Sequence, residues 1–114
     1  MLDPGAVLIT GASTGIGRAS AFFLERKGYR VFAGVRRDID AKALRQEASE
    51  RLTPIILDVT DGETIEHARD LIGGVTDSLA GLVNNAGIAV AGPLEALSLE
   101  DVRHQFEVNV FGVL

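Results

Sequence analysis

A glycine-rich heptapeptide near the N-terminus, Gly11–Gly17 (GASTGIG), contains the residue types that point most directly to chemistry. It follows a short apolar run and precedes a helical pattern, so it is expected to join a strand to the start of a helix. Unpaired backbone N–H groups and the positive end of the helix dipole meet at such a point, and glycines let a ligand approach the backbone. The heptapeptide therefore predicts an anion site, for which the pyrophosphate of a dinucleotide is the natural ligand.

The spacing of these glycines separates the loop from two other phosphate-binding loops. A nucleoside triphosphate P-loop has four residues between its glycines, whereas three stand between Gly11 and Gly15, and no Gly-Lys-Ser follows. The common dinucleotide pattern G-x-G-x-x-G is only partly present, because Ser20 takes the place of its third glycine. A tight turn without a ligand is the alternative, and the position between a strand and a helix favours phosphate binding.

Strand-like and helix-like patterns alternate along the chain. Short β-branched apolar runs predict strands at 6–10, 30–35, 54–59 and 81–84, with Pro54 in the first position of its strand, where a missing N–H is tolerated. Helical spacing predicts helices from the glycine loop to Gly28, over 38–51, over about 60–74, and from Ser98 onward. This alternation predicts an α/β fold, a Rossmann-type doubly wound parallel sheet of about four strands with flanking helices, and therefore an incomplete sheet.

Two helix starts carry capping signals. Thr60 and Glu63 fit a capping box, in which each side chain bonds to the backbone of the other residue, and Ser98 with Asp101 marks the start of the last helix. Apolar residues then recur every four positions without a stop signal, at Val102, Phe106, Val110 and Leu114. We therefore expect this helix to continue to Leu114 and the sequence to be part of a longer protein.

Three further short motifs follow the glycine loop in order: Asp58-Val59, Asn84–Gly87 (NNAG) and Asn109 within Val108–Gly112 (VNVFG). Together with Thr10–Gly17 they resemble the N-terminal half of the short-chain dehydrogenase/reductase family, and the resemblance covers essentially the whole chain. Each motif is short, but the four together, each at the expected strand end or helix, are specific. The resemblance implies an oxidoreductase that interconverts a secondary alcohol and a ketone or aldehyde by hydride transfer, and a homo-oligomer at full length.

The resemblance also implies roles for individual residues. The loop would face the cofactor phosphates and ribose, Asp58 would accept from the adenine amine, and Asn85 would contact a ribose. Asn109 would hold a water that supports a catalytic lysine, and it is the one residue assigned to catalysis. The residues assigned to the cofactor are Gly11, Ser13, Thr14, Gly15, Ile16, Gly17, Arg36, Arg37, Asp58, Val59, Asn85, Ala86 and Gly87. Local backbone bonding by Asp58, a simple turn at Asn85 and helix packing by a buried Asn109 are the structural alternatives.

The residues after the second predicted strand bear on the choice between NAD and NADP. At this point an acidic residue binds the ribose 2′-hydroxyl of NAD, whereas arginine pairs with the 2′-phosphate of NADP. Arg36 and Arg37 follow Val35, so NADP is expected, with Arg36 as its principal partner. NAD is the less favoured cofactor, and it stays in consideration because Asp38 and Asp40 lie close by. The structural alternative is that the two arginines are solvated surface residues without a ligand.

The family's proton-donating residues are missing from these 114 residues. The family uses a serine and a tyrosine with a lysine four positions on, but Tyr29 is followed by Ala33 at that spacing. General acid catalysis contributes roughly 10²- to 10⁴-fold. Residues 1–114 are thus expected to be a single NAD(P)-binding Rossmann domain, truncated before the catalytic segment and inactive alone. A non-catalytic redox-sensing or scaffold module, and a nucleotide-sugar or flavin binder, stay open as alternatives.

The amino-acid composition limits the classes of protein and of site that the chain can represent. The hydrophobic share of 46% and charged share of 24% are typical of one packed globular domain. The absence of cysteine excludes disulfides and thiolate zinc sites, and a net charge of −5 opposes nucleic-acid binding. His67 and His104 lack metal-ligand spacing, so both are interpreted as surface residues and no metal is expected. No secretory leader and no membrane span are expected. The expected location is cytoplasmic.

Overall fold

The computed structural model describes residues 3–114, so the first two positions of the predicted 1–114 domain lie outside it. Helices and strands alternate throughout. They are β1 (Ala6–Ile9), α1 (Gly15–Arg26), β2 (Arg30–Val35), α2 (Asp38–Glu47), β3 (Leu52–Ile56), α3 (Gly62–Gly73), β4 (Gly81–Val83) and α4 (Leu99–Asn109), with single turns of 3-10 helix at Leu94–Ala96 and Phe111–Val113. The alternation predicted from the sequence is confirmed.

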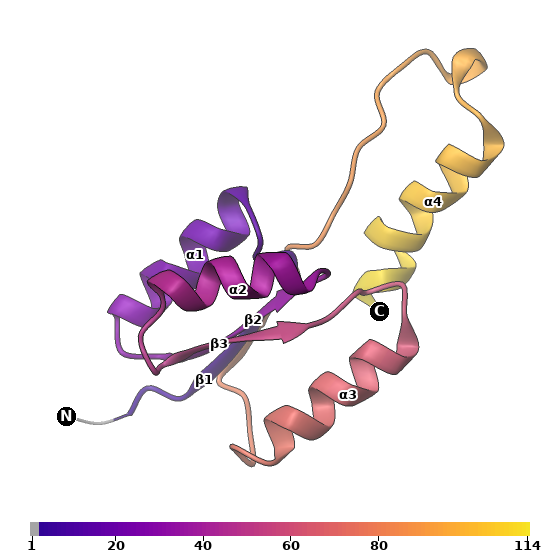
Figure 1. Cartoon of the computed structure of the whole chain (residues 1–114). Coiled ribbons are helices and arrows are strands. Elements are labelled where there is room, and N and C mark those ends of the chain that lie inside the picture. The colour runs from indigo at the N-terminus through magenta and orange to yellow at the C-terminus, as the bar shows by residue number, and fades with distance from the viewer. Residues whose placement is uncertain (1–2) are drawn as a thin grey trace.

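The strands form one parallel sheet in the order β3-β2-β1-β4. β1 and β2 are the inner strands, and the direction in which strands are added reverses between β1 and β4. Helices α1 and α2 cover one face of the sheet and α3 lies on the other (Figure 1). This is the doubly wound Rossmann arrangement that the sequence predicts.

The side chains of β2 show how the two faces are built. Val31, Ala33 and Val35 are buried in the cluster that includes Ala21 of α1 and residues of α2. Phe32, between them in sequence, is buried on the opposite face with residues of α3. Both clusters exist because successive strand residues point to opposite faces, which is why this strand reads as a continuous apolar run rather than an alternating one.

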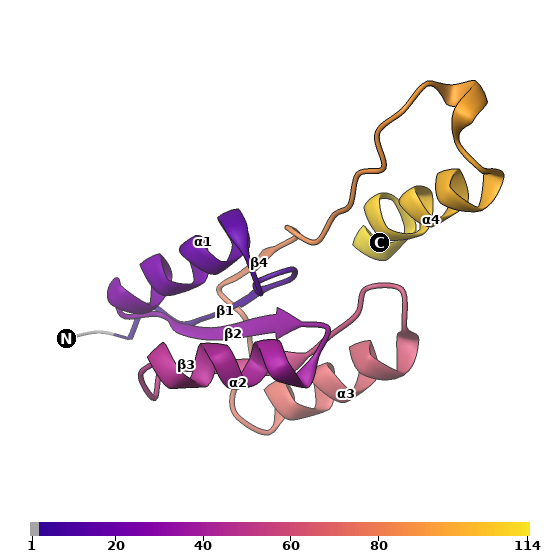
Figure 2. The same ribbon diagram turned by 45° about the horizontal axis from the view of Figure 1, so that its top comes forward.

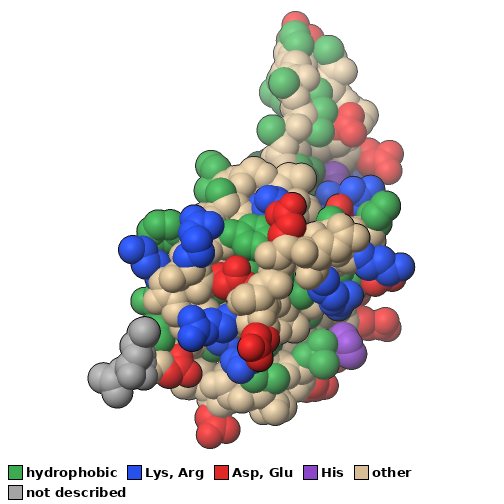
Figure 3. Space-filling view, turned by 60° about the vertical axis from the view of Figure 1, so that its left-hand side comes forward, with side chains coloured by type: hydrophobic (Ala, Val, Ile, Leu, Met, Phe, Trp, Pro, Cys, Tyr) green, Lys and Arg blue, Asp and Glu red, His purple; other side chains and the backbone are tan. Residues whose placement is uncertain are grey.

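Helix α4 stands beyond the carboxyl ends of the strands, joined to β4 by residues 84–98, which are irregular apart from the 3-10 turn Leu94–Ala96 (Figure 2). On the face shown in Figure 3, acidic and basic side chains are intermingled over the main body, and hydrophobic side chains are visible on the projecting part. Leu94 and Leu99 are 75% and 63% exposed there. β4 is an edge strand, and its Leu82 is 54% exposed because no helix covers it among the residues described.

The predicted end of α2 is wrong. The helix ends at Glu47 rather than at 51, and Leu52 belongs to β3. Ser49 donates from both its N–H and its hydroxyl to the carboxylate of the buried Glu25, at 2.8 Å each. These bonds hold the chain out of the helix, and they join residues too far apart in sequence for a local pattern to reveal.

The predicted place of Pro54 is also wrong, since it is the third residue of β3 rather than the first. The strand tolerates it because β3 lies at the edge of the sheet. Leu57 donates its N–H to Val35 O at 2.8 Å, so the alternation along the strand turns the nitrogen of Pro54 away from β2. No ladder hydrogen bond is therefore lost.

Of the two predicted helix starts, one is confirmed and one is wrong. Ser98 Oγ accepts from the N–H of Asp101 at 3.0 Å and caps α4, as predicted. For α3 the N-cap is Asp61, whose Oδ1 accepts from the N–H of Glu63 at 3.0 Å. Thr60 is engaged elsewhere, because both its N–H and its hydroxyl donate to the carboxylate of Asp58.

The expected continuation of α4 to Leu114 is wrong as well. The α-helix ends at Asn109, and the chain tightens into the 3-10 turn Phe111–Val113. Gly112 lies so close to Val59 that a Cβ at this glycine would stand 2.6 Å from Val59 Cγ2. The four-residue apolar repeat therefore continues past the end of the helix. Beyond that end, Gly112 packs closely against Val59.

Candidate functional site

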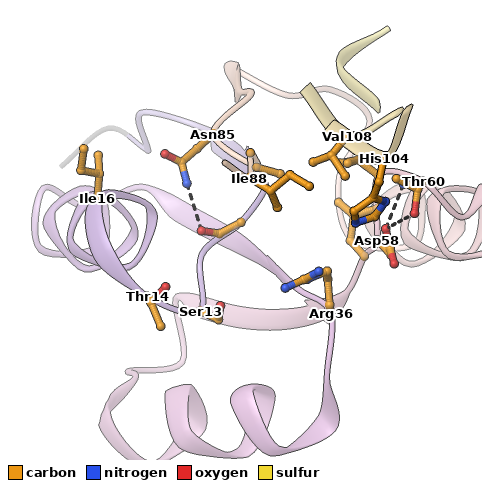
Figure 4. Close-up of a pocket in the computed structure, with 15 residues that line it drawn as sticks. Ser13, Thr14, Ile16, Arg36, Asp58, Thr60, Asn85, Ile88, His104 and Val108 are labelled. Carbon is orange, nitrogen blue, oxygen red and sulfur yellow. Dashed lines mark hydrogen bonds between the residues drawn. The ribbon is translucent and has the colours of Figure 1, made fainter. Parts of the chain in front are cut away.

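A cavity of about 330 Å³ lies between the glycine loop, the carboxyl ends of β2 and β3, the segment after β4 and α4 (Figure 4). It stands at the carboxyl edge of the parallel sheet, where the order of the strands reverses and where open α/β sheets bind ligands. Most residues predicted for the site line it. These are Gly11, Ser13, Thr14, Ile16, Arg36, Asp58, Val59, Asn85, Ala86 and Gly87.

The glycine loop forms one wall of the cavity. Gly11 and Gly15 have φ angles of +66° and +61°, a left-handed conformation that favours glycine. Thr14 is the N-cap of α1, but its hydroxyl does not bond to the first turn. The N–H groups of that turn are therefore open to an external acceptor, and the helix dipole favours a negative one.

Two close contacts explain why glycines are required in this wall. A Cβ at Gly11 would stand 2.7 Å from Ala86 Cα, and a Cβ at Gly17 would stand 2.3 Å from Gly11 O. Both atoms belong to the backbone, which cannot rotate aside as a side chain can. The loop thus forms a cradle that side chains would fill, and this shape suits a diphosphate.

Asn85 connects the loop to the segment after β4. Its side chain donates to Gly11 O at 3.0 Å (Figure 4). The N–H groups of Asn85 and Ala86 both donate to the buried Thr10 Oγ1 at 3.0 Å. The side-chain nitrogen of Asn85, the residue expected to contact a ribose, is therefore already bonded to the loop. Asn85 shapes the cavity by fixing the distance between two of its walls.

At the other end of the cavity, Asp58 lies with Thr60, Arg36 and His104 (Figure 4). Asp58 Oδ1 accepts from the N–H of Thr60 at 2.9 Å and from its hydroxyl at 2.7 Å. Partial burial raises the pKa of Asp58, but these two bonds and the charges of Arg36 and His104 outweigh it, so the net pKa lies below 3.8. The group is a carboxylate at neutral pH, and the local bonding considered from the sequence is present.

Four predicted residues lie outside the cavity lining: Gly15, Gly17, Arg37 and Asn109. The side chain of Arg37 is 72% exposed, and its Nε bonds to Asp40 Oδ2 at 3.0 Å. Gly15 and Gly17 lie in the first turn of α1, which the cradle adjoins. Arg37 is thus the neighbour of the cavity arginine rather than a second arginine within it.

Asn109 is exposed rather than buried as the helix-packing alternative supposed. Its amide bonds to both backbone groups of one residue: Ile88 N donates to Oδ1 at 2.9 Å, and Nδ2 donates to Ile88 O at 2.8 Å. Gly87 makes room for it, because a Cβ there would stand 3.3 Å from Asn109 Oδ1. Asn109 therefore attaches α4 to the segment after β4, which is the helix-packing alternative.

Sequence reasoning missed five residues of the lining. They are Leu57, Thr60, Ile88, His104 and Val108. His104 is exposed as predicted, but it also faces the cavity, one helical turn before the buried Val108. The i, i+4 spacing of these two residues was the available signal, and it could be used only once α4 was known to lie over the cavity.

Residues 3–114 contain no group of three or more His, Asp or Glu side chains that could hold a metal ion. In the same part of the chain, no helix has the length and apolar character needed to cross a bilayer.

Comparison with known proteins identifies the family. The model for the short chain dehydrogenase family matches residues 5–114. Dehydrogenase/reductase SDR family member 9 of Bos taurus is 40% identical over 95% of this chain and 35% of its own length. The NADPH-dependent 3-dehydrocapnine reductase of Ornithobacterium rhinotracheale is 38% identical over 91% of this chain and 38% of its own length.

A solved structure supports the same family. The NADPH-bound structure of an ElxO variant superposes with a TM-score of 0.85 at 30% identity, over 95% of this chain and 45% of that one. The chain thus spans little more than a third of the length of the two relatives and less than half of this solved chain. The fold, the motifs and these matches together show that the chain belongs to the short-chain dehydrogenase family.

Proposed function

We propose that the cavity binds NADP(H) and that the protein interconverts a secondary alcohol and a ketone or aldehyde, with this chain providing the cofactor-binding part. The observation that carries the cofactor choice is the placement of the two arginines after β2. Arg36 lines the cavity, whereas Arg37 points outward and pairs with Asp40. Of the two carboxylates that kept NAD in consideration, Asp40 is thus bonded to Arg37, and neither Asp38 nor Asp40 lines the cavity, whereas the cation of Arg36 does.

The comparisons support this choice of cofactor. One relative is named as NADPH-dependent, and a solved structure of the same fold contains NADPH. Bound NADP(H) would supply the hydride that is exchanged with the substrate. The residues of this chain would bind and orient it, since the serine, tyrosine and lysine of the family's catalytic pattern are not found at the required spacing in this sequence.

Each wall of the cavity would hold one part of the cofactor. The backbone N–H groups at Ser13, Thr14 and Ile16 would bind the pyrophosphate, because they stand at the positive end of α1. Arg36 would pair with the 2′-phosphate and Asp58, beside Val59, with the adenine amine. Ala86 and Gly87 would border the ribose of the nicotinamide half.

Asn109 would act as a positioning residue in this site. Its two hydrogen bonds to Ile88 hold α4 against the segment that follows β4, and α4 supplies one side of the cavity through His104 and Val108. The main chain of Asn109 is the part of this residue that a bound water could use, because the side chain already bonds to Ile88.

Titration of the full-length protein with NADPH and NADH, monitored by nicotinamide fluorescence, tests the proposal. Arg36→Ala should weaken NADPH binding by about 1.5–3 kcal/mol, roughly 10- to 150-fold, because a charge-assisted bond is lost. NADH binding should change little. Arg37→Ala is the matched control, since it removes the same charge outside the cavity. Equal losses for the two dinucleotides, or equal effects of the two substitutions, would refute the assignment.

A further inference from the structure

Thr64 lies outside the cavity lining but bonds to the wall formed by the residues that follow β3. Its hydroxyl oxygen accepts from the N–H of Asp58 at 3.0 Å. The same oxygen stands 3.0 Å from Asp58 O and 2.8 Å from Asp61 O, so its single hydrogen is donated to one of these two carbonyls. One threonine side chain thus bonds to the backbone of Asp58, and the proposed function leaves this threonine without a role.

The end of β3 explains why this hydroxyl is needed. Leu57 donates its N–H to Val35 O of β2 at 2.8 Å, so the N–H of the next residue, Asp58, points away from β2. β3 is the edge strand of the sheet that the described residues form, so no neighbouring strand accepts from this N–H there. A partly buried N–H needs an acceptor, and Thr64 supplies the one that the sheet does not.

Helix α3 holds the hydroxyl in place. Thr64, Ala68 and Ile72 follow one another at four-residue spacing, so they lie on the same side of α3. Ala68 and Ile72 are buried against the sheet in the cluster that contains Phe32. The packing of α3 on the sheet therefore fixes the point at which Thr64 bonds to the backbone after β3.

The turn that Thr64 holds carries three residues of the cavity lining, Asp58, Val59 and Thr60. Asp61 donates its N–H to Asp58 O at 2.9 Å and closes the turn. Thr60 donates twice to the carboxylate of Asp58 within it (Figure 4). These contacts are internal to the turn, whereas the bonds of Thr64 join the turn to a packed helix.

We infer that Thr64 is a positioning residue for the cofactor: it bonds to the backbone of Asp58 from α3, fixes the cavity wall 58–60, and so raises the affinity for the dinucleotide. The inference rests on the proposed function, because it requires a dinucleotide in the cavity. It does not depend on the choice between NADP and NAD, because Arg36, which lies outside this wall, is the residue proposed to meet the 2′-phosphate. Thr64 should therefore affect the two dinucleotides alike.

The test compares Thr64→Val with Thr64→Ser in the full-length protein, titrated with NADPH and with NADH and monitored by nicotinamide fluorescence. Thr64→Val keeps the shape of the side chain but removes the hydroxyl, so both affinities should fall about 3- to 10-fold, the worth of one hydrogen bond. Thr64→Ser keeps the hydroxyl and should bind both dinucleotides within about twofold of the unsubstituted protein. Exchange of the Asp58 amide hydrogen, followed by NMR, should be faster in Thr64→Val and unchanged in Thr64→Ser.

Thr76→Val is the matched control. Thr76 follows α3 at its other end, donates its hydroxyl to Ser78 O at 3.0 Å, and is not part of the cavity lining. The substitution removes a comparable hydrogen bond and should leave both affinities unchanged. Binding is measured under conditions in which circular dichroism shows each variant to be folded, so that a loss of stability alone does not lower the affinity.

The outcomes separate this inference from the proposed function. Unchanged binding of both dinucleotides by Thr64→Val, or an equal loss in Thr64→Ser, would overturn the inference and leave the proposed function standing. A loss for NADPH alone would also overturn it, because Thr64 would then act through the 2′-phosphate. Failure of the unsubstituted protein to bind either dinucleotide overturns both. If Thr64→Val does not fold, Thr64→Ala carries the same prediction, because it also lacks the hydroxyl.

Discussion

Gly17→Ala is the most informative single change in the glycine loop. The added methyl group would stand 2.3 Å from Asn85 Nδ2 and 2.3 Å from Gly11 O. The amide of Asn85 can rotate away, at the expense of its 3.0 Å bond to Gly11 O. Gly11 O is part of the backbone, so the contact with it can be relieved only by moving the loop away from α1.

The size of the effect follows from these two costs. Overpacking a close contact costs about 1–3 kcal/mol, and loss of the Asn85 bond adds about 1 kcal/mol. The free energy of unfolding should therefore fall by about 2–4 kcal/mol in urea denaturation. NADPH affinity should fall about tenfold or more, because the N–H groups that would bind the pyrophosphate move with the loop.

Gly62→Ala is the matched control for that experiment. A Cβ at this first residue of α3 would meet no atom within 4 Å, so unfolding should change by no more than about 0.5 kcal/mol and NADPH binding not at all. The reasoning about the cradle is refuted if Gly17→Ala unfolds at the same urea concentration as the unsubstituted protein and binds NADPH equally well.

Two further predictions concern the other walls of the cavity. Thr60→Val removes one of the bonds that hold the pKa of Asp58 below 3.8, so the carboxyl should titrate at higher pH in NMR; an unchanged titration would contradict the role of Thr60. Because that pKa is lowered by folding, the stability that ionised Asp58 contributes is complete above pH 3.8 and is lost as the pH falls through the folded-state pKa. Asn109→Ala removes both bonds to Ile88 and should speed hydrogen exchange in α4 while leaving β1 and β2 protected; unaltered exchange in α4 would show that these bonds do not hold the helix.

The main features of the fold could be predicted from local patterns. β2 begins and ends at the residues that its apolar run indicates, and the glycine loop stands between β1 and α1 as its composition requires. These features depend on neighbours in sequence. Buried parallel strands are short apolar runs, and a capping residue such as Ser98 marks a helix start in the sequence.

The features that could not be predicted depend on contacts between distant residues. The end of α2 is set by Ser49 bonding to Glu25, and Asn109 bonds to Ile88, which lies 21 positions earlier in the sequence. For the same reason His104 was interpreted as a surface residue only. Gln105 and Asn109 hold α4 beside the cavity, but their partners Val90 and Ile88 lie 15 and 21 positions earlier in the sequence.

Asp58 was open to two interpretations, and the structure shows why both could be entertained. One carboxylate oxygen bonds to Thr60, two residues on, which is the local turn that an Asp at a strand end favours. The side chain of Asp58 also lines the cavity, which is the second interpretation. A residue that serves the local backbone on one side and a cavity on the other cannot be assigned to a single role from its sequence context.

The central claim is that the loop between β1 and α1 binds the diphosphate of NADP(H). A crystal structure of the full-length protein with NADPH tests it most directly. We predict the pyrophosphate against the backbone N–H groups of Ser13, Thr14 and Ile16, with the 2′-phosphate beside the guanidinium of Arg36. A diphosphate bound elsewhere on the protein, with the loop empty at saturating NADPH, would contradict the claim.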